Sequence, residues 1–124
     1  MTTLPPPSRL SVDVILQEAP DFRALRSRDV NSSEVFVALS EFISVIYATD
    51  FVVSFDWMDE YKQSTDLDPH NLEPIEKADL PTLRKLLIAH LRLDRFCDGH
   101  LKLLLSTGYL EKLIERLKVL RPAT

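Results

Sequence analysis

Apolar residues recur every three or four positions along most of the chain, a pattern that predicts helices. The longest such stripe runs from Val35 to Ile46 and predicts a helix reaching about Val52. The β-branched residues in 44–55 could instead form a strand, but the preceding helical period and the lack of a partner strand favour a helix. Near the C-terminus, residues 110–120 place leucines on one side and charges on the other. Both stripes indicate helices packed on a shared core.

Residues that commonly begin or end helices stand beside the apolar stripes. The expected N-caps are Ser11, Asn31, Asp56 or Ser54, and Asp79. Asp79 would open a helix over about 80–97, and the two glycines, Gly99 and Gly108, fall at expected breaks. The proline-rich residues 1–8 predict a disordered tail, and residues 9–124 a single domain. We therefore predict an all-α protein, an irregular orthogonal bundle of about five or six helices.

Composition places the chain among ordinary globular proteins. It has 124 residues, of which 45% are hydrophobic and 27% charged, so one domain is expected. Cys97 is the single cysteine, which excludes an internal disulfide and favours a reducing, cytoplasmic location. No apolar run approaches the ~20 residues of a membrane span, and the N-terminus lacks the pattern of a secretory signal.

Charge is distributed unevenly along the chain. The net charge is -4, but residues 50–79 carry nine acids against two lysines, and residues 80–124 carry an excess of bases. One interpretation is that these halves attract each other; the other is an acidic face that engages a basic protein partner. The candidate partner-binding residues are Asp56, Trp57, Asp59, Glu60, Asp66, Asp68, Glu73 and Glu76. For the lone tryptophan among them, a core position is favoured. A pI of 5.3 argues against direct nucleic-acid binding.

A second group of polar residues lies within an apolar helical stretch, residues 83–101. Steps of three and four place His90 and Asp94 on the same line as leucines, so we expect the imidazole and the carboxyl group to pair. His100 would join them only if Gly99 bends the chain. The candidate site residues of this stretch are His90, Arg92, Asp94, Arg95, Asp98 and His100.

Three interpretations of this group stay open: a structural polar pair, an imidazole oriented by a carboxylate for general-base or ligand-binding work, and a partner-binding seam. A metal site is disfavoured because the spacing matches no familiar ligand pattern. Cys97 is expected to be buried and inert, and His70 to lie in a solvated loop. No cofactor is expected, and no catalytic residue is assigned.

The sequences FDWMDEY, ADLPTLRKLLIAHLRLDRFCDGHL and STGYLEKLIERLKVL, within residues 55–120, resemble a small bacterial family of domains of unknown function. Its signature runs approximately TLRKLLTxHxRxDRFCxGHL, and Ile88 stands where this pattern has threonine. The resemblance implies a bacterial or prophage origin, and the signature positions that it marks are His90, Arg92, Asp94, Arg95, Phe96, Gly99 and His100. It implies no activity.

The leading hypothesis is a small cytoplasmic protein-interaction module without chemistry of its own. A specific version is a phage-encoded inhibitor of a nucleic-acid-handling defence complex, of the anti-CRISPR kind, whose acids occupy a basic groove. The alternative is an enzyme or small-ligand-binding domain centred on His90 and Asp94. A third possibility is a homodimer, because Leu103, Leu104 and Leu105 exceed one helical face.

Overall fold

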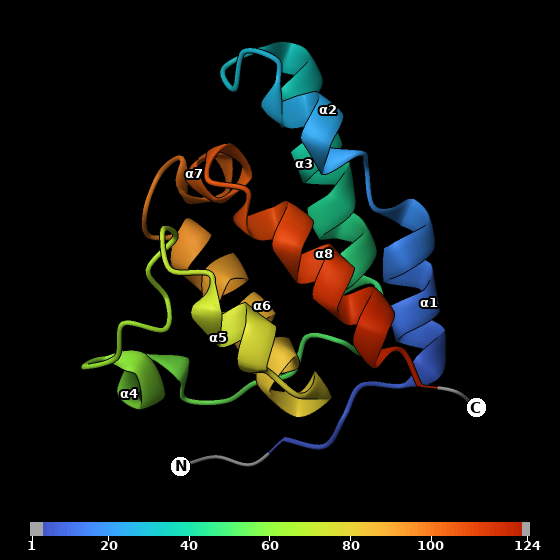
Figure 1. Cartoon of the computed structure of the whole chain (residues 1–124), viewed down its shortest axis with the longest axis vertical. Helices are drawn as coiled ribbons and strands as arrows, with labels where there is room; N and C mark the ends of the chain where they lie inside the picture. Colours follow the sequence, from blue (N-terminus) through green and yellow to red (C-terminus); the bar gives the residue numbers. More distant parts are fainter. Residues whose placement is uncertain (1–3, 123–124) are drawn as a thin grey trace.

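The structure, a computed structural model, describes residues 4–122, which form eight helices and no strand (Figure 1). The helices are α1 (Arg9–Glu18), α2 (Phe22–Arg26), α3 (Ser33–Tyr47), α4 (Trp57–Tyr61), α5 (Glu73–Lys77), α6 (Leu80–Asp94), α7 (His100–Ser106) and α8 (Tyr109–Leu120). The all-α prediction is confirmed. The helix count exceeds the expected five or six because the connections contain helices of only five residues, such as α2 and α5.

Helix α8 crosses the middle of the molecule (Figure 1) and contacts α1, α2, α5, α6 and α7. Helix α1 packs beside α3 on one side of α8, while α6 lies on the other side, partly behind α5 in this view, and contacts α4 at the periphery. Leu113 and Leu117 of α8 are fully buried, as the apolar stripe in 110–120 predicts. Of its charged residues, Glu115 and Lys118 are exposed, whereas Glu111, Lys112 and Arg116 are partly buried.

Helix α6 is the most deeply buried element. Every side chain from Leu83 to Leu91 is buried, polar ones included. A helix surrounded by protein on all sides must satisfy its polar side chains internally. Lys85 does so through a paired carboxylate, Glu60 of α4, at 3.0 Å. This pair fastens the short helix α4 to α6.

The predicted start of α1 and both predicted ends of α3 are wrong. Helix α1 begins after Ser8, whose hydroxyl oxygen accepts a hydrogen bond from the Ser11 amide. The Ser11 side chain instead pairs with Asp50. Helix α3 begins after Ser32 rather than Asn31, and it ends at Tyr47 rather than Val52. It ends there because the Thr49 hydroxyl donates to the Ile46 carbonyl and accepts from the Phe51 amide.

The segment expected to be a disordered tail, residues 1–8, is described from Leu4 onward. Leu4 is buried, and the Pro5 carbonyl accepts a hydrogen bond from Nη1 of Arg84 at 2.9 Å. The same guanidinium donates to the carbonyls of Asp50 and Phe51. Arg84 thus ties the N-terminal segment and the segment after α3 to α6. Within residues 4–122, no helix combines the length and apolar character needed to span a bilayer.

Candidate functional site

The two histidines of the signature stretch meet in the interior. Helix α6 ends at Asp94, and Gly99 adopts a left-handed conformation with φ of 78° before α7 starts at His100. Because a side chain at this φ is strained, glycine suits the turn. The turn brings Nε2 of His100 to 2.9 Å from Nδ1 of His90, with the rings stacked at 5.1 Å between centroids. The chain therefore does bend at Gly99, which was the condition for His100 to join His90.

Asp94 does not pair with His90, so that prediction is wrong. Its Oδ1 accepts a hydrogen bond from the Leu101 amide at 3.0 Å. The first amides of a helix have no partner within the helix, and a carboxylate at the end of the preceding helix can satisfy one. Asp94 therefore closes the turn between α6 and α7, and its negative charge favours the protonated form of His100.

The imidazole pair is isolated from solvent. His90 is fully buried, and its ring packs against the Tyr109 ring at 4.6 Å with an interplanar angle of 70°. Burial, with a smaller contribution from the neighbouring His100, lowers the pKa of His90 to about 3. Burial also lowers the pKa of His100, against the influence of Asp94. Both rings are therefore neutral at neutral pH.

Two polar atoms beside the pair, Nε2 of His90 and the hydroxyl of Tyr109, have no hydrogen-bond partner among residues 4–122. Such atoms carry a cost of about 1–3 kcal/mol each when buried. A general base must reach the proton that it removes, and a fully buried ring offers a solute no such approach. The geometry fits a structural pair that fixes α7 on α6.

The other signature residues do not converge on the imidazoles. Arg92 and Arg95 lie over the ring of Tyr47, at 5.6 and 5.4 Å from its centroid. Asp98 lines a surface hollow of about 580 Å³ beside α3, where Asp94 also borders it. Residues 4–122 contain no group of three potential metal ligands close enough to hold an ion. The signature stretch thus divides into three parts: a buried histidine pair, an arginine–tyrosine contact and two aspartates that line a surface hollow.

The acids of residues 50–79 are mostly exposed, but several of them cap helices or form ion pairs within the protein. Asp56 and Asp79 cap α4 and α6. Glu60 pairs with Lys85, and Glu76 with Lys112, which joins the acidic segment to the basic C-terminal half. These contacts support the interpretation that the halves attract each other. The remaining partner-binding candidates of the segment, apart from Trp57, are exposed acids: Asp59, Asp66, Asp68 and Glu73.

An aromatic contact at the surface was missed by the sequence reasoning. Trp57 of α4 is half-buried and is not part of the hydrophobic core, so the core position favoured from the sequence is wrong. Its ring lies 6.4 Å from that of Phe96, in the connection between α6 and α7. Phe96 is 69% exposed and Met58 is 52% exposed. Cys97 is exposed as well, so its predicted burial is wrong. Phe96 and Cys97 are exposed because α6 ends at Asp94, short of the predicted end near residue 97, which leaves residues 95–99 outside the core. His70 is exposed in a turn, as predicted.

The fold and site define a class: a small all-α domain whose dense polar stretch is folded inward as a buried imidazole pair. The chain belongs to a family of unknown function (DUF6508), whose model matches residues 27–123. The match begins well before residue 55, so it includes α3 as well as the signature stretch. Comparison with curated proteins gave no match, and comparison with solved structures gave none.

Proposed function

We propose that the domain is a protein-interaction module that binds a basic partner through an aromatic–acidic surface. This surface consists of Asp56, Trp57, Met58, Asp59 and Phe96. The observation that carries the proposal is the contact of half-buried Trp57 with a Phe96 ring that is 69% exposed. The two rings together form a contiguous apolar patch at the surface, and such patches, unlike singly exposed apolar residues, mark interaction sites.

The arrangement has the composition of a binding surface. Interfaces place aromatic residues and methionine at the centre and charged residues at the rim. Here Phe96, Trp57 and Met58 form the apolar part, and the neighbouring α4 carboxylates are exposed. Covering the Phe96 ring would contribute up to about 2 kcal/mol. The acids would favour a partner with lysines or arginines and would speed its association.

We further propose a cytoplasmic setting and a phage or prophage origin, with the partner belonging to a nucleic-acid-handling complex of the host. An exposed thiol at Cys97 is best tolerated where thiols stay reduced. Proteins that handle nucleic acid present basic grooves, which an acidic surface complements. Direct binding of nucleic acid by this acidic chain is disfavoured by the same charge argument.

The test compares two single substitutions of exposed apolar residues. Phe96→Ala removes the centre of the surface, whereas Val119→Ala removes a residue that is 72% exposed on α8, a different element. Tagged proteins are used to capture binders from an extract of cells that encode the domain, at low and high salt. The proposal expects a protein that wild type and Val119→Ala recover, that Phe96→Ala loses, and that salt weakens. Equal recovery by all three proteins would contradict it.

Self-association is the competing proposal. Leu104 and Leu105 are buried in the protein's own core, so only Leu103, which is 42% exposed, is left for a second subunit. This weakens the argument from surplus leucines. Light scattering at two concentrations decides: a constant monomer mass excludes the homodimer, and a concentration-dependent dimer supports it.

A further inference from the structure

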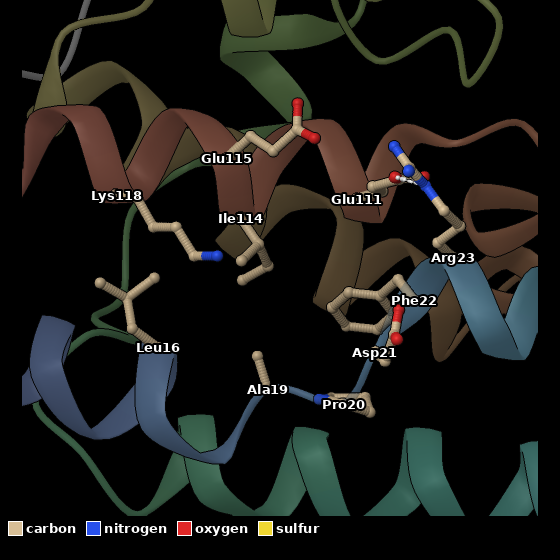
Figure 2. Close-up of a pocket in the computed structure, with 10 residues that line it drawn as sticks. All are labelled: Leu16, Ala19, Pro20, Asp21, Phe22, Arg23, Glu111, Ile114, Glu115 and Lys118. Carbon is tan, nitrogen blue, oxygen red and sulfur yellow. Dashed lines mark hydrogen bonds and ion pairs between the residues drawn. The ribbon is translucent and has the colours of Figure 1, made fainter.

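A second feature, remote from the aromatic–acidic surface, is a hollow between α8 and the connection of α1 to α2 (Figure 2). Its volume is about 490 Å³, which lies within the range of about 300–1,000 Å³ typical of small-molecule sites. Its apolar wall comes from α1, α2, α8 and the connection of α1 to α2: Leu16, Ala19, Pro20, Phe22 and Ile114. Phe22 and Ile114 are largely buried, so Leu16, Ala19 and Pro20 form the more accessible part of this wall. The wall exists because Pro20 ends α1 and turns the chain across α8.

The charged groups at the hollow are not equivalent. The Glu111 carboxylate is already bound by Arg23 and Arg26, each at 3.0 Å. The Asp21 carboxylate caps α2 by accepting from the Ala24 amide. In Figure 2 the Glu115 carboxylate points away from the apolar wall. None of these carboxylates is both unengaged and directed into the hollow.

Lys118 is the exception. Its side chain extends from α8 across the hollow toward Leu16 and Ile114, and its ammonium group hangs over apolar side chains (Figure 2). No hydrogen bond or ion pair links this ammonium to another group among residues 4–122. A cation beside an apolar wall is complemented by a molecule that is apolar along its length and anionic at one end.

We propose that this hollow binds a small amphiphilic carboxylate, with its hydrocarbon part on the apolar wall and its carboxylate paired with Lys118. A cationic amphiphile would place its charge beside Lys118 and would be repelled by it. A neutral one would gain the apolar contact but no ion pair. The proposal is independent of the partner-binding surface, because none of its residues belongs to that surface.

The probe is octanoate, with octan-1-ol and octylammonium as matched neutral and cationic molecules. The measurement is an NMR titration that follows the side-chain methyl groups of Leu16 and Ile114, with those of Leu103 as a remote reference. Octanoate is expected to shift the two hollow methyls in a saturable manner and to bind more tightly than either matched molecule. Octanoate that leaves these methyls unshifted, or that binds no better than octan-1-ol, overturns the proposal.

Two substitutions at one position test the role of the cation. Lys118→Met keeps most of the apolar stem and should weaken octanoate about two- to fivefold, the range of an exposed ion pair, while octan-1-ol is unaffected. Lys118→Glu should abolish octanoate binding and favour octylammonium. The control is Lys62→Met, because Lys62 lies at the C-terminal end of α4, away from the hollow. This substitution should leave the titration unchanged. Identical octanoate affinities in wild type and Lys118→Met would overturn the assignment of Lys118.

Discussion

Nδ1 of His90 lies 2.9 Å from Nε2 of His100, and this hydrogen bond joins α6 to α7 across the turn at Gly99. Ten residues separate the two histidines, so an unbroken helix would have held them about 15 Å apart along its axis, too far for the rings to touch. The pair is neutral, stacked and buried. We interpret it as a clamp that sets the position of α7, and with it that of the connection carrying Phe96.

The clamp predicts that the protein loses stability as pH falls. A histidine in the unfolded chain has a pKa of about 6.5, whereas burial holds the pKa of His90 near 3 in the folded protein. The unfolded state therefore binds a proton that the folded state excludes. The stabilisation is complete above pH 6.5 and is lost as pH falls toward 3. Between pH 7 and pH 5, His90 alone should lower the free energy of unfolding by about 2 kcal/mol. His100, whose pKa is also lowered by burial, acts in the same direction.

Urea unfolding at pH 7, 6 and 5 measures this dependence. In His90→Leu the fall in unfolding free energy between pH 7 and 5 should be smaller by about 2 kcal/mol, whatever the absolute stability. His70→Gln, which removes an exposed histidine, should leave the wild-type dependence unchanged. If His90→Leu keeps the full pH dependence, His90 is not the buried neutral group described here.

The two left-handed glycines should differ in their tolerance of alanine. At Gly99 an added Cβ meets no atom within 4 Å, so Gly99→Ala carries only the backbone strain of positive φ, about 1 kcal/mol. At Gly108 the Cβ would overlap the Arg26 guanidinium, which pairs with Glu111. Gly108→Ala should therefore lose more, by up to about another 1 kcal/mol. Urea unfolding compares the two, and an equal or reversed order would contradict the contact at Arg26.

Replacing Arg84 should destabilise the protein strongly. Its guanidinium is buried and donates to the carbonyls of Pro5, Asp50 and Phe51. Arg84→Met leaves these carbonyls without their donor, and we expect a loss on the order of 3 kcal/mol. Arg92→Met, which removes only a contact with the Tyr47 ring, should cost about 1 kcal/mol or less. Thermal unfolding of both variants checks the ranking, and similar losses would contradict the role given to Arg84.

The local parts of the fold follow from local patterns. Apolar spacing predicts α3, α6 and α8, because the period of a helix is written in its own residues. Asp56 and Asp79 act as the expected caps, since a cap and its amide lie three residues apart. The first residues of α1 and α3 were harder to predict because neighbouring serines and Asn31 are equally suitable N-caps.

The candidate site was only partly predictable for a related reason. The His90–His100 contact depends on the conformation of a single glycine, and the fate of Asp94 depends on where α6 ends. The Trp57–Phe96 contact joins residues that are far apart in sequence and belong to different elements. No periodicity encodes such a pair. One local signal was available: Gly99 as a break implied that residues just before it could lie outside the core.

The aromatic–acidic surface is tested most directly by the reactivity of Cys97. This residue is the single cysteine of the chain, it is exposed, and it follows Phe96 directly. Its alkylation rate can be measured by mass spectrometry for the purified protein, and again in extract of cells that encode the domain. We predict that extract slows the alkylation of wild type, and that Phe96→Ala or high salt removes this protection. Equal alkylation rates for wild type in buffer and in extract would contradict the proposed interaction surface.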